Sequence, residues 1–291
     1  MTRARATSIG FSAILMWALL ALLTIWSAPV PPLLLNALCF GIGGLIGVVW
    51  TARRGFQVLK GVPLAAYAFG TLGLFGAHFL YFTAFRLAPA AETGLIAYLW
   101  PLMIVLFSGL LPGERLGALH ITGALLSFSG AAIIVLGRGG ALGGGELAGL
   151  AVALLFALWW ALYSVGSRLF GRVPTEAVTV SCLATALLSA LAHVALETPQ
   201  WPERTTGWLA VIGLGLGPVG AAFFTWDVGM KRGDIQMLGV ASYAAPLLST
   251  IALMIAGEAE PSPLIALAAL LITAGAALAA SASAAARAPT G

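Results

Sequence analysis

The amino-acid sequence predicts an all-α integral membrane protein of ten transmembrane helices, arranged as two inverted five-helix repeats. Hydrophobic residues make up 60% of the 291 residues and charged residues only 8%, whereas a soluble domain has about 25% charged residues. Apolar runs of helical length follow one another with short connections, unlike the alternating strands of a membrane β-barrel. Two stretches, beginning at Gly76 and Gly220, also resemble each other along their length. Together these observations predict a duplicated bundle of membrane helices.

The ten expected spans are, in order, residues 8–26, 33–51, 63–85, 90–111, 117–137, 147–169, 175–196, 206–230, 235–257 and 262–282. The first span has a basic start, but its apolar run is longer than that of a cleaved signal peptide. The second and eighth contain Gly43-x-x-x-Gly47 and the run Gly213–Gly217, where small residues let helices approach closely. The fourth and ninth each contain Tyr-x-x-Pro, and turns with Gly-Glu precede the fifth and tenth.

The repeats define the expected domain organisation. Residues 1–137 form the first five-helix repeat, residues 138–146 a glycine-rich linker, and residues 147–291 the second repeat. Because each repeat has an odd number of spans, the two must lie in opposite orientations in the membrane. With the N-terminus inside, 11 of the 14 Lys and Arg residues fall on the inner side. This positive-inside bias predicts that both termini are cytoplasmic.

Polar side chains inside the spans are the candidate functional residues, because an ionisable group in the hydrocarbon is costly unless it is paired or hydrated. His78 lies roughly 10 Å below the outer end of its span at 1.5 Å per residue, and Tyr81 follows on the same helix face. A structural histidine bonded to a neighbouring group is the alternative. Asp227 is a candidate for coupling, but Lys231 at i+4 has the spacing of a surface ion pair. Glu114 is expected in a water-facing loop.

Aromatic residues with a polar group also lie far from the expected membrane interfaces. Buried tyrosine and tryptophan need a hydrogen-bond partner or water, so a group of them predicts a hydrated cavity, although some serve packing only. With His78, the candidate substrate-binding residues are therefore Trp17, Tyr81, Tyr98, Trp100, Trp160, Tyr163 and Tyr243. Pro101 and Pro246 are expected to break their helices and free the carbonyl four residues earlier, or to make kinks that only improve packing.

The two stretches and their Tyr-x-x-Pro segments resemble the EamA-type carriers of the drug/metabolite transporter superfamily over essentially the whole chain. Within it, the segment GAHFLYFTAFRLAPAAETGLIAYLWPL is similar to the YddG-type exporters of aromatic amino acids. The resemblance implies a bacterial inner-membrane protein with a central cavity between its halves. It implies export of amino acids, and of related molecules such as methyl viologen, by alternating access and without ATP.

Other functions remain alternatives. A multidrug, nucleotide-sugar or cofactor-precursor carrier would share this fold, and a membrane-embedded enzyme belongs to another class. Three scattered histidines argue against the enzyme, which needs clustered metal-binding or acid–base groups. Neither lysine has the context of a phosphate-binding loop. No cofactor, metal or nucleic acid is therefore expected; the expected partners are the lipid bilayer and an amino acid substrate, and the oligomeric state is left open.

Overall fold

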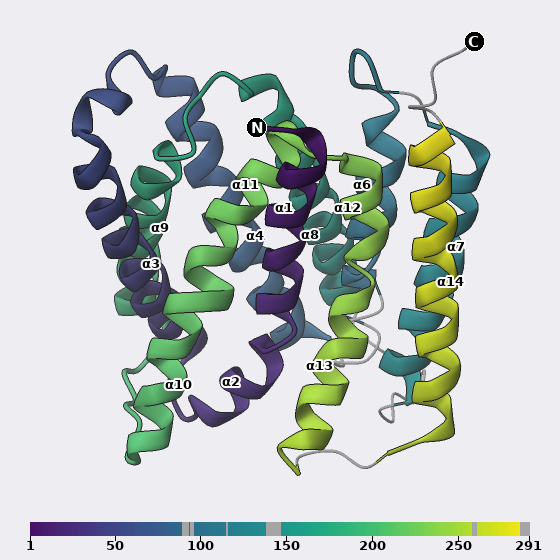
Figure 1. Cartoon of the computed structure of the whole chain (residues 1–291). Helices are drawn as coiled ribbons and strands as arrows, with labels where there is room; N and C mark the ends of the chain where they lie inside the picture. Colours follow the sequence, from purple (N-terminus) through teal and green to yellow (C-terminus); the bar gives the residue numbers. More distant parts are fainter. Residues whose placement is uncertain (89–92, 94–95, 115, 138–146, 258–260, 286–291) are drawn as a thin grey trace.

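In a computed structural model, the chain is a bundle of long helices that run between two faces (Figure 1). The structure describes all residues except 89–92, 94–95, 115, 138–146, 258–260 and 286–291. Its helices are α1 (Arg3–Trp17), α2 (Leu20–Trp26), α3 (Pro32–Arg54), α4 (Leu64–Leu87), α6 (Trp100–Ser108), α7 (Ala118–Gly137), α8 (Leu147–Gly166), α9 (Ala177–Leu196), α10 (Thr205–Leu216), α11 (Ala222–Arg232), α12 (Ile235–Ala241), α13 (Ala244–Ile255) and α14 (Pro263–Ala285). Short turns are η1 (Phe56–Leu59), η2 (Ser167–Phe170) and the π-helical η3 (Gly217–Ala221).

Eight helical segments of the described chain are long and apolar enough to cross a membrane. They are Arg3–Trp26, Pro32–Arg54, Leu64–Phe85, Leu147–Phe170, Ala177–Leu196, Thr205–Arg232, Ile235–Ile255 and Pro263–Ala282. A shorter apolar helix covers Ala118–Ile133. The expected fourth span is described only in part, and the expected linker 138–146 lies outside the described residues. The chain is therefore a multi-pass, all-helical membrane protein.

Helices of residues 1–137 pack against helices of residues 147–291 throughout the bundle. The most extensive pairs are α7 with α14, α3 with α9, α1 with α11, and α4 with α8, and α6 also packs against α8 and α12. The start of α1 and the end of α14 lie at the same face, drawn at the top of Figure 1 and called here the N-terminal face. The two parts of the chain are thus interleaved, and the core lies between them.

The Tyr-x-x-Pro segments interrupt their helices just before each proline. Tyr98 and Leu99 form a turn ahead of α6, and Ser242 and Tyr243 separate α12 from α13. Pro101 and Pro246 therefore occupy the first turn of the following helix, where a missing N–H costs little. The Ser242 carbonyl accepts a hydrogen bond from the Ala245 N–H at 3.1 Å. The expectation that this carbonyl is free is therefore wrong, because a tight turn satisfies it.

A π-helical turn at Gly217–Ala221 joins α10 to α11. Pro218 has no N–H for the regular helical bond, which accounts for the wider turn here. The turn brings Gly220 against α3, where a Cβ on Gly43 would lie 2.6 Å from the Gly220 Cα. Close glycine packing is thus confirmed at Gly43, but Gly217 has open space around its Cα.

Candidate functional site

Four tryptophans, one each from α1, α6, α8 and α11, meet between the two parts of the chain; they are Trp17, Trp100, Trp160 and Trp226. The ring centroid of Trp17 lies 6.2 Å from Trp100, 6.0 Å from Trp160 and 5.0 Å from Trp226. Trp100 also contacts Trp160 and Trp226 edge to face, an arrangement that aromatic quadrupoles favour. We call these four residues the tryptophan cluster.

Two of the four indole N–H groups are bonded within the protein. Trp17 Nε1 donates to the Pro218 carbonyl at 3.0 Å, and Trp226 Nε1 donates to Ser164 Oγ at 3.1 Å. Trp100 and Trp160 are buried, yet neither indole N–H has an acceptor among the described residues. Neither indole nitrogen is among the fully buried atoms without a partner, so these two donors are available to water or to a ligand.

His78 lies in an aromatic box next to this cluster. Its Nδ1 lies 2.8 Å from the Leu74 carbonyl, so the neutral ring carries its proton there. Its ring contacts Phe40 at 5.0 Å and Phe223 at 5.6 Å, both edge to face. Phe223 in turn contacts Trp160 at 6.0 Å. The remaining nitrogen, Nε2, is then an acceptor with no donor among the described residues, in the same aromatic core as the tryptophan cluster.

The four candidate tyrosines do not meet at one place, although Tyr81 and Tyr98 lie near each other. Tyr163 adjoins the tryptophan cluster, with its ring 5.3 Å from Trp160. Tyr98 is half-buried in the turn before Trp100. Tyr81 packs on Phe85 at 4.6 Å and Phe156 at 5.2 Å, and has no ring contact with the four tryptophans among the described residues.

Tyr243 belongs to a separate apolar cluster formed with α7 and α14. It is fully buried, and its hydroxyl accepts the Leu102 N–H at 3.1 Å, which caps α6. The structure thus brings Trp17, Trp100, Trp160 and Tyr163 together and leaves Tyr243 apart. The sequence analysis selected aromatic residues that carry a polar group, so it omitted Phe223. In the structure Phe223 contacts both His78 and Trp160.

Asp227 and Lys231 form an ion pair of 2.8 Å, with both side chains more than nine-tenths buried. The expected surface pair is therefore a buried one. Asp227 also accepts a hydrogen bond from Thr175 Oγ1 at 2.8 Å, and Lys231 donates to the Val173 carbonyl at 3.2 Å. The pair thus ties α11 to the segment before α9. It also borders a cavity of about 30 Å³ that Tyr163 lines as well.

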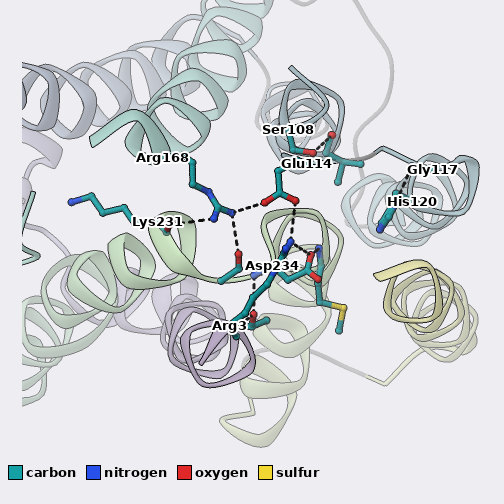
Figure 2. A network of polar contacts seen from close by, with 12 residues as sticks. Arg3, Ser108, Glu114, Gly117, His120, Arg168, Lys231 and Asp234 are labelled. Carbon is teal, nitrogen blue, oxygen red and sulfur yellow. Dashed lines mark hydrogen bonds and ion pairs between the residues drawn. The ribbon is translucent and has the colours of Figure 1, made fainter. Parts of the chain in front are cut away.

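An ion network joins four segments at the N-terminal face (Figure 2). Arg3 of α1 lies 3.0 Å from Glu114, which follows α6, and 3.8 Å from Asp234, the N-cap of α12. Arg168 of η2 lies 3.4 Å from Glu114 and donates to the Gly233 carbonyl at 3.0 Å. We call Arg3, Glu114, Arg168 and Asp234 the four-residue network. The expected water-facing position of Glu114 is wrong, because only 11% of its side chain is exposed.

The opposite face has different chemistry. A cavity of about 250 Å³ lies between the ends of α3, α4 and α9, lined by Leu33, Phe79, Phe82, Thr83, Leu87 and Leu196. The Thr83 hydroxyl donates to the Phe79 carbonyl at 2.7 Å. This cavity therefore offers an apolar surface but no charge or free donor for a polar head group.

Comparison with known proteins agrees with this architecture. A family model described as the EamA-like transporter family matches residues 5–136 and again residues 147–281. The chain belongs to the EamA-like transporter family. It is 53% identical over 283 residues to the "Aromatic amino acid exporter YddG" of Ancylobacter novellus, covering 96% of this chain and 98% of that relative. A protein of the same name from Escherichia coli K12 is 27% identical over 264 residues, covering 86% of this chain and 88% of the relative.

A solved crystal structure has the same fold, with a TM-score of 0.92 at 53% identity over 96% of this chain and 97% of that one. Membership of the EamA-like family makes the chain a membrane transporter rather than an enzyme. For a transporter, a group of aromatic side chains with unused hydrogen-bonding atoms between two interleaved halves is the natural candidate for a substrate site.

Proposed function

We propose that the protein exports amino acids, aromatic ones included, across the bacterial inner membrane by alternating access and without ATP hydrolysis. The observation that carries the proposal is the tryptophan cluster, with its two unbonded indole N–H groups, which Phe223 connects to the ring of His78. Aromatic faces suit an aromatic side chain or a cation. The N–H donors suit a carboxylate, and the imidazole nitrogen accepts from an ammonium group. The printed name of the 53% identical relative supports the same substrate class.

Under this proposal the ten spans form two inverted repeats, residues 1–137 and 147–291, and the N-terminal face is cytoplasmic. The helix pairs support the symmetry. The helices α1 and α8 belong to the first span of each repeat, and α4 and α11 belong to the third. Exchanging the repeats therefore turns the α1–α11 pair into the α8–α4 pair, and both pairs are present. The same exchange maps α3–α9 and α7–α14 onto themselves. Arg54, Arg168, Lys231 and Arg232 end their segments at the N-terminal face, in agreement with the positive-inside rule.

Alternating access requires that one face closes while the other opens. The four-residue network joins both repeats at the N-terminal face, so the described conformation is closed there. At the opposite face, the 250 Å³ cavity lies beside Phe82, whose ring is 6.3 Å from that of His78. A substrate released from the aromatic core would leave on that side, in the direction of export.

The coupling role of Asp227 also remains a proposal. The Asp227 carboxylate is paired with the Lys231 ammonium group in a buried site. Because an unpaired buried charge is costly, the pair should separate when Asp227 is protonated or when another cation replaces Lys231 as its partner. Pro101 and Pro246, at the start of α6 and α13, are proposed to mark the points where these helices bend during gating.

Purified protein in liposomes, loaded with one labelled compound at a time, tests the substrate class. We expect saturable exchange of phenylalanine and tryptophan without ATP, and little transport of a nucleotide sugar. Exchange of methyl viologen alone would make the protein a cation or multidrug carrier of the same fold. Absence of exchange with any amino acid would contradict the proposed function.

A further inference from the structure

The buried ion pair at the end of α11 faces a cavity. Asp227 and Lys231 line the 30 Å³ space together with side chains from α4, η2 and α9. Two buried charges cost several kcal/mol to desolvate, and their attraction repays this cost only with additional hydrogen bonds. Thr175 and the Val173 carbonyl supply one such bond each. These bonds hold the pair on one side and leave its other side open to the cavity.

Two hydroxyl groups on the walls of this cavity have no partner. Tyr163 is 8% exposed and Ser181 is 4% exposed, and neither hydroxyl makes a hydrogen bond among the described residues. Neither hydroxyl oxygen is fully enclosed by protein, so both can form a hydrogen bond with a molecule in the cavity. Since about 10–15 Å³ of such space holds one water molecule, the cavity of about 30 Å³ admits only about two or three waters in this conformation.

The other walls are aromatic and lead to the tryptophan cluster. Phe69 of α4 contacts Tyr163 at 5.4 Å and Phe170 of η2 at 5.0 Å. Tyr163 continues the contact to Trp160 at 5.3 Å. The cavity thus combines a positive group, a negative group, two free hydroxyls and aromatic rings, next to the proposed substrate site and on the N-terminal side of it.

We infer that this cavity is a second subsite, which binds the zwitterionic head group of an α-amino acid as it enters from the N-terminal face. Lys231 takes the carboxylate, Asp227 takes the ammonium group, and the hydroxyls of Tyr163 and Ser181 complete the site. In the closed conformation the two charged side chains satisfy each other. A lone metal cation fits this cavity less well, because the Lys231 ammonium group is already paired with the Asp227 carboxylate and would repel it. This inference rests on the proposed function.

Everted membrane vesicles, in which the N-terminal face meets the bath, test the subsite. We would compare phenylalanine with phenethylamine, which lacks the carboxylate, and with 3-phenylpropionate, which lacks the ammonium group. Lys231→Gln should raise the KM for phenylalanine about tenfold or more, the usual effect of losing a hydrogen bond to a charged group. It should change the KM for phenethylamine much less, because this compound has no carboxylate. Asp227→Asn should raise the KM for phenethylamine and change the KM for 3-phenylpropionate much less.

A purely structural ion pair predicts another result. The double variant Asp227→Asn with Lys231→Gln removes both charges together, so a structural pair would be repaired and the KM for phenylalanine would return to the wild-type value. The subsite instead requires a KM at least as high as in either single variant. Tyr163→Phe and Ser181→Ala leave the charges in place, and each should raise the KM two- to fivefold even if the charge variants fail to fold.

The outcomes separate the two proposals. Two results would contradict the subsite and leave the proposed function standing, provided that wild-type vesicles transport phenylalanine. One is a double variant with the wild-type KM for phenylalanine. The other is an equal change in KM for all three compounds in each variant. If wild-type vesicles transport no amino acid, the proposed function fails first and the subsite with it.

Discussion

At the N-terminal face, four charged side chains from four separate segments are joined by ion pairs (Figure 2). At the opposite face, the described cavity is lined by five apolar side chains and one threonine. The Arg3 side chain is 40% exposed, so water can solvate it when its ion pairs break, whereas the side chains of Glu114 and Asp234 are mostly buried. The cavity at the opposite face has no ion pair among its lining residues. The comparison shows that charged contacts join separate segments at the N-terminal face, whereas the described surface at the opposite face is apolar.

The largest expected effect comes from reversing a charge in the four-residue network. Glu114→Lys would place a third positive group beside Arg3 and Arg168, which now lie 3.0 and 3.4 Å from the Glu114 carboxylate. Like charges at this distance repel, so the N-terminal face should open. A Ser167→Cys reporter, which borders the small cavity, should then react several-fold faster with a thiol reagent applied at that face.

This labelling needs a background without the two native cysteines, Cys39 and Cys182, which are both buried. Arg53→Gln is the matched control, because Arg53 is exposed at the same face and has no ion pair in the described structure. Equal labelling in Glu114→Lys and in the control would show that the network does not hold this face closed.

A smaller effect is expected when Glu197 is changed, at the end of the α3–α9 pair that lies away from the N-terminal face. Glu197 accepts the Leu33 and Leu34 N–H groups at 3.1 and 3.2 Å, and its carboxylate lies 2.9 Å from His193 Nδ1. It therefore caps α3, whose own N-cap makes no side-chain bond. Glu197→Gln should lower the free energy of unfolding in detergent by about 2 kcal/mol, typical of hydrogen bonds to a charged group. An unchanged unfolding midpoint would contradict this role.

The smallest effect is expected for Arg54→Gln at the opposite end of the same helix pair. Arg54 lies 2.6 Å from Glu176; the Arg54 side chain is 61% exposed and that of Glu176 only 3% exposed. Because the cation lies mostly in water, which weakens its attraction to the carboxylate, the loss in unfolding free energy should be about 1 kcal/mol, less than for Glu197→Gln. A loss as large as that of Glu197→Gln would show that the two ends of the pair are equally important for stability.

The sequence predicts the fold well where the signal is local. Apolar runs of helical length predict the membrane spans, and the prolines at 101 and 246 correctly mark interrupted helices. The i+4 spacing of Asp227 and Lys231 predicts their ion pair but not its burial, because burial depends on α9 and η2 packing over that face. Long-range packing of this kind has no local pattern.

The same reason explains what the sequence analysis missed. The four-residue network joins segments as distant as Arg3 and Asp234, and nothing next to Glu114 in the sequence distinguishes it from a loop residue in water. Among the aromatic candidates, mid-span position identifies Trp100 and Trp160 but equally selects Tyr243, whose hydroxyl caps α6. Only the interleaving of the two repeats decides which of these side chains meet.

The central claim is that substrate binds at the tryptophan cluster between the two faces, and two adjacent tryptophans test it. Trp160 is buried in the cluster, whereas Trp159 is 36% exposed and donates to the Leu72 carbonyl at 3.1 Å. Phenylalanine exchange in liposomes should fall at least tenfold in Trp160→Ala, since loss of aromatic and hydrogen-bond contacts costs about 1.4 kcal/mol or more. It should stay within about twofold of wild type in Trp159→Ala at equal protein abundance. Equal rates in the two variants would contradict a substrate site at this cluster.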